Sequence, residues 1–418
     1  MKHSQTEISP NKATSGDPAG EQWRATASGF CAILVGIGLA RFAYSPLIPA
    51  LIEAGWFSAA QTAYLGAANL AGYLAGALLA GRMAERFTLM AALRAMMALA
   101  ALSFFASALP LDFWWYTGWR LAAGIAGGAL MVLGPPAALT RVPPHRHGLA
   151  GGIIFAGVGF GIVLSGTLVP PLLQAGLPET WLALGGLAAL LALVAEPGWR
   201  GLRQSRAAHP TRAPRKRVPV PRDPVLLAMF VVYGLCAVGL VPHMVFLVDF
   251  VARGLGRGIG EGALIWVLFG LGAILGPLLI GHLADRIGLV RALRLGFLLQ
   301  IAGIGLIAVV EDVWALALSS LIAGAFVPGN TALVLGRVRA LFPGDLARQQ
   351  ATWGVATTAF AIGQAAAAYG FAALIDAGGA GYMLFAFGAG ALGLALAVDL
   401  VASKPAAIQQ PPGTVTDP

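Results

Sequence analysis

Residues 72–94, GYLAGALLAGRMAERFTLMAALR, and residues 272–294, GAILGPLLIGHLADRIGLVRALR, are two copies of one segment displaced by 200 positions without a gap. Eleven of the 23 aligned positions are identical, and Glu85 aligns with Asp285 as a conservative change. An ungapped internal repeat of this length indicates that the chain consists of two similar halves.

The composition places both halves in a membrane. Hydrophobic residues make up 58% of the chain, charged residues only 11%, and the mean hydropathy is +0.78. Soluble proteins carry about 25% charged residues, so this chain has too little charge to cover a soluble surface. Twelve stretches are long and apolar enough to cross a bilayer: 28–50, 58–81, 89–109, 113–139, 148–173, 179–196, 224–251, 260–283, 290–310, 313–340, 349–376 and 379–402.

The connections between these spans fall into two sets by charge. Of the 27 Lys and Arg residues, Arg41 and Arg120 lie within spans, Arg253 and Arg257 lie on one side, and the rest lie on the other. The positive-inside rule places the basic side, and with it both termini, in the cytoplasm. The net charge of +9 is then explained by orientation and by anionic lipid, which excludes nucleic acid as a partner.

These observations predict an all-α membrane protein of twelve transmembrane helices in two pseudo-symmetric six-helix bundles. Halves with an even number of spans form parallel repeats related by an axis along the membrane normal, with the binding site between them near the midplane. The lone cysteines, Cys31 and Cys236, lie in apolar runs and suggest neither a disulfide nor a metal site. A monomer without cofactors is expected. The expected organisation is a disordered cytoplasmic tail over 1–27, bundles over 28–196 and 224–402, a basic cytoplasmic linker over 197–223 and a disordered tail over 403–418.

A family resemblance rests on the repeat. GHLADRIG, residues 281–288, resembles the signature loop G-x-L-A-D-R-x-G of the major facilitator superfamily, and GRMAERFT, residues 81–88, is a looser copy. The segments GLARFAYSPLIPALIEAGW (38–56), QTAYLGAANLAGYLAGALLAG (61–81) and AFAIGQ (359–364) are similar to the YbfB/YjiJ-type branch. That branch commonly has Gly-Pro soon after the Gln, whereas Gln364 is followed by AAAAYG, so we expect a different helix geometry there.

The resemblance implies a multi-pass transporter of the plasma membrane, which is the inner membrane in a Gram-negative cell. It also implies a conformational gate at the two signature loops, where contacts form in one state and break in the other. The gate candidates are Gly81, Glu85, Arg86, Gly281, Asp285 and Arg286, with Arg141 and Arg337 as possible partners of the acids. The alternative is a static, solvated ion pair, which contributes roughly 0–1 kcal/mol.

The first, fourth, seventh and tenth helices line the central cavity in this superfamily, which singles out Arg41 and Arg120. At 1.5 Å per residue, Arg41 lies roughly 20 Å from the cytoplasmic start of its span and Arg120 roughly 10 Å from the external start. In a core of about 30 Å both arginines share one level, where they can face one anionic group. Tyr44, Asn330 and Gln364 complete the candidate binding set.

Two further residues of the seventh span, His243 and Asp249, are candidates for proton coupling or for a gate. Each candidate also has a structural alternative. The arginines can bond to backbone carbonyls, Asn330 and Gln364 can hydrogen-bond between helices, and Tyr44 can simply pack.

The expected function is secondary active transport of a small solute by alternating access, with protons as the coupling ion. Two arginines against one acid favour an anionic solute. The chain has no G-x-x-x-x-G-K-[ST] loop for ATP and no cluster of catalytic residues in its loops, so an enzyme is not expected. One alternative is proton-driven efflux of a hydrophobic or drug-like compound, although GVGFGIVLSG (157–166) lacks the Gly-Pro of that class. Another is a non-transporting sensor on a transporter frame.

Overall fold

A computed structural model describes residues 18–200, 202 and 223–402. The first half contains α1 (Pro18–Ile33), η1 (Leu34–Leu39), η2 (Phe42–Leu47), α2 (Ile48–Glu53), α3 (Ala59–Arg86), α4 (Leu89–Ser107), α5 (Phe113–Leu139), η3 (Pro144–Arg146), α6 (His147–Leu173) and α7 (Leu177–Trp199). The second contains α8 (Pro224–Val241), η5 (Pro242–Phe246), α9 (Leu247–Asp249), η6 (Phe250–Gly254), α10 (Gly258–Ile287), α11 (Leu289–Ile307), α12 (Val313–Leu341), α13 (Leu346–Asp376) and α14 (Gly381–Ala402).

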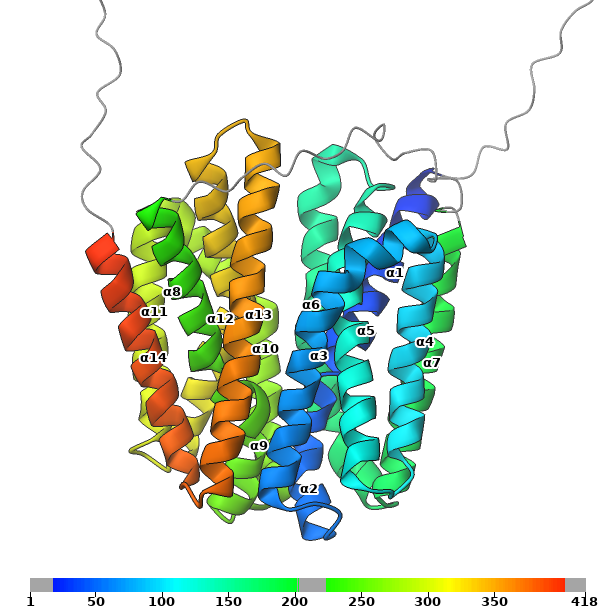
Figure 1. Ribbon diagram of the computed structural model, residues 1–418, viewed down its shortest axis with the longest axis vertical. Coiled ribbons are helices and arrows are strands. Elements are labelled where there is room, and N and C mark those ends of the chain that lie inside the picture. The colour runs from blue at the N-terminus through cyan, green and yellow to red at the C-terminus, as the bar shows by residue number, and fades with distance from the viewer. Residues whose placement is uncertain (1–17, 201, 203–222, 403–418) are drawn as a thin grey trace, which may run out of the picture.

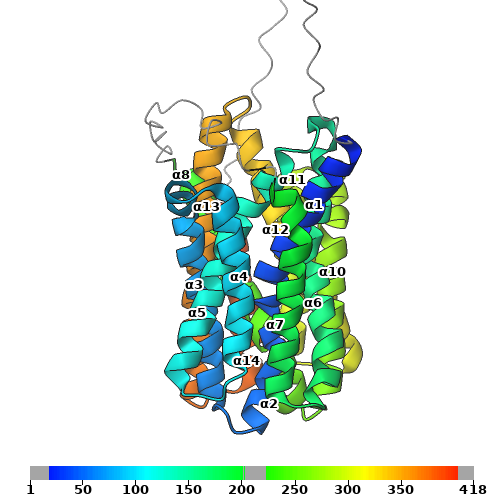
Figure 2. The same cartoon turned by 90° about the vertical axis from the view of Figure 1, so that its right-hand side faces the viewer.

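Twelve helical spans within the described residues are long and apolar enough to cross a membrane, which confirms the predicted fold class. Six belong to each half, and the two halves stand side by side (Figure 1). The helices α1 and α8 begin at the same end of the molecule in both views (Figures 1 and 2). We call this the basic end, because α3 and α10 finish there with Arg86 and Arg286. The opposite, acidic end carries α2 and α9.

The first helix begins earlier than expected. Residues 18–27, predicted as part of a disordered tail, belong to α1. Their helix is stabilised by packing on α7, where Ser28 Oγ donates a hydrogen bond to the Ala195 carbonyl at 2.6 Å. The helix α7 likewise extends into the predicted linker and includes residues 197–199. Burial of the Trp199 side chain stabilises this last turn. Residues 1–17, most of the linker and the tail after 402 lie outside the described residues.

The repeated glycines explain why the two halves share one architecture. A methyl group on Gly72 or Gly76 would collide with the backbone carbonyls of Leu121 and Ile125 on α5. In the second half, Gly272 and Gly276 make the same close approach to α12. Backbones at this separation leave no room for a side chain, and in lipid such close van der Waals packing is one of the forces that join helices. Close helix packing therefore requires glycine at these four positions, whereas Gly81 and Gly281 have open space beside them.

The two halves touch towards the acidic end and separate towards the basic end. On α6, Gly152, Gly159 and Gly166 share one face because seven residues make nearly two turns. Gly159 and Gly166 pack against α10, whereas a methyl group on Gly152 would meet nothing within 4 Å. The helices α3 and α13 follow the same course: they lie side by side near the acidic end, where Tyr64 and Tyr369 have ring centroids 6.3 Å apart, and they diverge towards the basic end (Figure 1).

Candidate functional site

The helix that begins with α1 is broken at the predicted depth of Arg41. The π-helical segment η1 ends at Leu39, and the 3-10 segment η2 follows from Phe42 with Pro46 inside it. Proline removes a backbone donor, and π- and 3-10 turns leave carbonyls out of the regular α-helical pattern. At this break the Ala40 carbonyl accepts two side-chain hydrogen bonds, from Asn69 Nδ2 at 3.3 Å and from Arg120 Nη1 at 3.1 Å.

Arg120 lies inside the first half. Its side chain comes from α5, is 3% exposed, and sits over the ring of Tyr44 with 4.1 Å between the guanidinium carbon and the ring centroid. Its Nε has no hydrogen-bond partner. Tyr44 in turn donates to the Thr62 carbonyl at 2.9 Å. Arg120 and Tyr44 therefore stabilise the broken part of the first helix through contacts within the first half.

Arg41 points the other way, towards the second half. It is half-buried, although its neighbours Ala40 and Phe42 are buried. Its Nη2 donates to the sulfur of Met244 at 3.3 Å, and its guanidinium carbon lies 4.9 Å from the ring centroid of Phe42 and 5.4 Å from that of Tyr73. The two arginines lie at one depth along the helices, since Arg120 bonds to the carbonyl of the residue before Arg41. Their guanidinium groups point in different directions, that of Arg120 into the first half and that of Arg41 towards the second half.

The two arginines lack a counter-charge among the described residues, where no Asp or Glu forms an ion pair with Arg41 or Arg120. A cation within the membrane is costly, by about 2.5–3.5 kcal/mol on insertion scales, and such residues normally face partners or a polar cavity. A thioether sulfur and two aromatic faces stabilise Arg41 only weakly in comparison with a carboxylate.

The helix that begins with α8 is broken at the same height as the first. Pro242 opens the π-helical segment η5, and after α9 a second π-helical segment, η6, follows. Met244 lies in η5 and joins the two breaks: its carbonyl accepts a hydrogen bond from Ser45 Oγ at 2.8 Å, and its sulfur accepts the bond from Arg41. The two interrupted helices thus meet at one methionine.

Gln364 reaches the same methionine from α13. Its Nε2 lies 3.7 Å from the Met244 sulfur, the side chain is 1% exposed, and its Oε1 has no hydrogen-bond partner. An unpartnered polar atom at such depth carries a cost of about 1–3 kcal/mol. Arg41, Met244 and Gln364 form what we call the central cluster, which holds one unpaired cation and one unpartnered amide oxygen.

A group of aromatic side chains continues from the central cluster towards the basic end. Tyr233 on α8 lies against Phe360 and Trp353 of α13, with ring centroids 4.6 and 6.0 Å apart. Its hydroxyl lies 3.0 Å from Thr331 Oγ1 on α12. Trp353 and Phe360 are half-buried.

Two candidate residues of the second half point away from the central cluster. His243 is buried between Phe269 and Phe385, and its Nε2 lies 2.8 Å from Ser319 Oγ on α12. Asn330 exchanges hydrogen bonds with the amide of Gln300 on α11, at 2.9 and 3.3 Å. Both side chains therefore face the interior of their own bundle.

Asp249 is half-buried near the acidic end. Its carboxylate forms a two-point contact with Arg253 one turn further on, at 2.6 and 3.2 Å. It lies in α9, which packs on α2 of the other half.

Five of the six gate candidates in the signature loops are exposed at the basic end, and Gly281 is half-buried there. Among the described residues, Glu85 and Asp285 form no ion pair with an arginine. The suggested partners are occupied elsewhere: Arg141 lies 3.4 Å from Glu21, and Arg337 lies 2.6 Å from Asp399.

Asp399 is the acid that sequence reasoning missed. Its side chain is 1% exposed, and it binds Arg294 of the repeat at 2.8 Å as well as Arg337. Arg94, at the matching place in the first repeat, pairs with Glu196 on α7. A single carboxylate in the otherwise apolar last span was the available signal. Asp399 thus ties α14 to α11 and α12 at the basic end.

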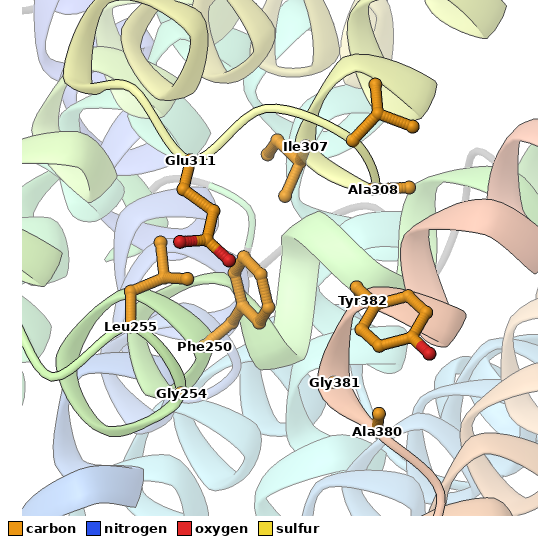
Figure 3. Close-up of a pocket in the computed structure, with 10 residues that line it drawn as sticks. Phe250, Gly254, Leu255, Ile307, Ala308, Glu311, Ala380, Gly381 and Tyr382 are labelled. Carbon is orange, nitrogen blue, oxygen red and sulfur yellow. The ribbon is translucent and has the colours of Figure 1, made fainter.

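A cavity of about 520 Å³ lies in the second half at the acidic end, away from the central cluster. Figure 3 shows Glu311 directed towards the ring of Phe250, with Leu255 and Tyr382 on the rim. The Glu311 backbone carbonyl accepts a hydrogen bond from Arg257. Within the described residues no group of His, Cys, Asp and Glu is arranged to hold a metal ion.

The comparisons with known proteins match this architecture. A family model described as "Uncharacterised MFS-type transporter YbfB" matches residues 33–400, which include the helices discussed here except α1, of which only Ile33 is matched, and the last two residues of α14. No curated protein matches the chain.

Proposed function

The chain belongs to the MFS-type transporter family of YbfB and is a multi-pass membrane transporter, and from this premise we propose that it carries a small anionic solute by secondary active transport. The observation that supports the charge of the solute is Arg41, a half-buried cation between the halves whose contacts are a sulfur and two rings. An anion that binds Arg41 would supply the missing counter-charge, and Gln364 Nε2, an amide donor beside Met244, offers a second polar contact.

Alternating access is supported by the asymmetric closure of the two halves. Contacts such as Ser45 with Met244 and Trp266 with Ser165, at 2.8 and 3.1 Å, join the halves on the acidic side of Arg41. In the opposite state these contacts would open and the free faces of α6 and α10 would meet at the basic end. The positive-inside rule supports a cytoplasmic basic end, with both termini in the cytoplasm.

The signature loops act as the gate in this proposal. In the state that is open at the basic end, Glu85 and Asp285 are exposed, and neither forms an ion pair with another residue that the structure describes. They would gain partners when Gly81 and Gly281, which now have open space around them, approach the other half. The fixed cluster of Asp399, Arg294 and Arg337 would move with the second half as one body.

Proton coupling is assigned to Asp249. Its contact with Arg253 joins α9, which lies between the two π-helical segments, to η6, next to the closure of the acidic end. Protonation of the carboxylate would weaken this ion pair and release the segment. His243 is a weaker candidate because its ring is enclosed by Phe269 and Phe385.

The test is uptake of radiolabelled benzoate, lactate and succinate into proteoliposomes with an imposed pH gradient. We expect uptake of at least one of these anions, and at least a tenfold loss for Arg41→Gln. The matched control is Arg200→Gln, because Arg200 is an exposed arginine at the basic end whose partner Glu196 also binds Arg94. Normal uptake by Arg41→Gln would refute the anion site.

A second measurement separates coupling from binding. Asp249→Asn should lose accumulation driven by the pH gradient but keep exchange of labelled for unlabelled solute, which needs no net proton movement. Loss of both activities in a folded Asp249→Asn variant would contradict the assignment of proton coupling to this residue.

A further inference from the structure

The aromatic face of α13 next to the central cluster bears on the class of the solute. Trp353, Phe360 and Gln364 follow one another at spacings of seven and four residues, so they share one face of the helix. The exposed apolar residues Val355 and Ile362 each lie two positions further on, about 200° around the helix. The aromatic side chains therefore face the interior of the molecule and not the lipid.

This face lies on the open side of the molecule. It runs from Gln364 towards the basic end, where α3 and α13 diverge (Figure 1). Trp353 and Phe360 stay half-buried although Tyr233 packs against both, so part of each ring remains uncovered. Tyr73 of α3, which contacts Arg41, is likewise half-buried.

The spacing sets the size of the group that fits. Phe360 lies four residues from Gln364, a rise of about 6 Å along the helix. A carboxylate held by Arg41 and Gln364 would place a six-membered ring, attached directly to it, at the level of Phe360 and Tyr233. Aromatic rings prefer offset-stacked or edge-to-face contacts with centroids about 4.5–7 Å apart.

We propose that the central cluster and the aromatic face of α13 bind an aromatic carboxylate, with the carboxylate at Arg41 and the ring against Phe360. This inference rests on the proposed anion transport and specifies the body of the anion. The first half supplies the charge contact and the second half supplies the surface for the ring.

The experiment measures binding to the purified full chain in detergent by isothermal titration calorimetry. The probes are benzoate, cyclohexanecarboxylate, propionate and benzamide, which separate aromaticity, ring size and charge. We expect benzoate to bind about three- to tenfold more tightly than cyclohexanecarboxylate, as aromatic pairing is worth about 0.5–1.5 kcal/mol. Benzamide, which lacks the charge, should bind at least tenfold more weakly than benzoate.

Two variants locate the preference. Phe360→Leu should remove the advantage of benzoate over cyclohexanecarboxylate while propionate binding stays within about twofold of the unchanged chain. Trp353→Leu should leave the binding of all four probes within about twofold of the unchanged chain, because Trp353 lies a further two turns away. Phe387→Leu is the control, since Phe387 is 58% exposed on α14 and takes no part in the site.

The outcomes distinguish the two proposals. Equal binding of benzoate and cyclohexanecarboxylate, with Arg41→Gln weakening both, would overturn the aromatic preference and leave anion transport standing. Absence of any binding that depends on Arg41 would overturn the proposed function together with this inference. Benzoate binding that depends on both Arg41 and Phe360 would support both.

Discussion

The broken helices of the two halves lie at the same height but are held in different ways. In the first half the Ala40 carbonyl is bound by Asn69 and Arg120, both from the same half. In the second half, Met244 at the break is bound by Ser45 and Arg41 from the other half and by Gln364 from its own half. The first break is therefore held at Ala40 by its own half alone, whereas the second depends in part on contacts that exist while the halves meet at the acidic end.

The difference follows from the sequence at positions related by the repeat. An offset of 200 residues pairs Arg120 with Ser320 and Asn69 with Phe269, while the frame glycines Gly124 and Gly324 stay the same. Both copies of the fourth helix also begin with an aspartate cap, Asp112 and Asp312. The frame, by which we mean the helix packing at the paired glycines, is thus the same in both halves. The charged side chains differ, because Arg41 and Arg120, the two cations within membrane spans, both belong to the first half.

The largest expected effect is on the symmetric frame. Gly76→Val and Gly276→Val should each destabilise the protein by at least about 3 kcal/mol, the upper end of overpacking costs, because the new side chain meets a backbone carbonyl that cannot move aside. The measurement is the yield of monodisperse protein in size-exclusion chromatography and the midpoint of thermal unfolding.

The chain supplies its own controls for this frame. Gly81 and Gly281 lie five residues after Gly76 and Gly276 on the same helices. Gly81→Val and Gly281→Val should leave the unfolding midpoint unchanged within a few degrees, because a methyl group added at either position meets no atom within 4 Å. A loss in only one half would show that the two frames are not energetically equivalent.

The second prediction concerns the asymmetric chemistry at Arg120 and Ser320. Arg120→Met should change stability by less than about 1 kcal/mol, because the cost of an embedded cation, about 2.5–3.5 kcal/mol, is removed together with a charged hydrogen bond of about 1.5–3 kcal/mol and the contact with Tyr44. Solute uptake should nevertheless fall at least tenfold, since the break at Ala40 that positions Arg41 loses one of its two side-chain bonds.

Ser320→Ala is the matched variant in the second half. The Ser320 hydroxyl is buried and lacks a partner, so its removal should leave uptake unchanged and stability equal or slightly higher. Unfolding of the Arg120→Met variant would indicate that Arg120 is required for the frame, and an uptake defect in Ser320→Ala would remove the asymmetry between the halves.

The sequence was sufficient for the frame but not for the directions of the side chains. Hydropathy located the spans, and the repeat located the signature loops, because both depend on composition and order alone. A helix in lipid is apolar on all sides, so its pattern does not state which face meets which neighbour. For that reason the sequence did not show that His243, a candidate for proton coupling or for a gate, faces the inside of its own bundle. Met244, which joins the two breaks, is apolar and carried no signal.

The arginines show the same limit. Their common depth followed from counting residues, and Arg120 does reach the carbonyl next to Arg41. Their opposite directions follow from the break itself, where the change from a π-helical to a 3-10 turn rotates Arg41 towards the second half. Such a change of helix type depends on tertiary packing around Pro46, which no local pattern expresses.

The smallest expected effect compares two buried amides. In the second half, Asn330 and Gln300 satisfy each other, so Asn330→Leu should cost only about 0.6 kcal/mol, the average for a hydrogen bond between membrane helices, and the double variant Asn330→Leu with Gln300→Leu should recover most of that loss. In the first half, Asn69 binds the carbonyls of both Ala40 and Arg120, which have no side chain to remove in compensation. Asn69→Leu should therefore be more destabilising and should also reduce uptake. Thermal unfolding of the three variants, with uptake measured in parallel, decides the comparison: equal losses for Asn69→Leu and Asn330→Leu, without a defect in uptake, would mean that the first break needs no support from Asn69.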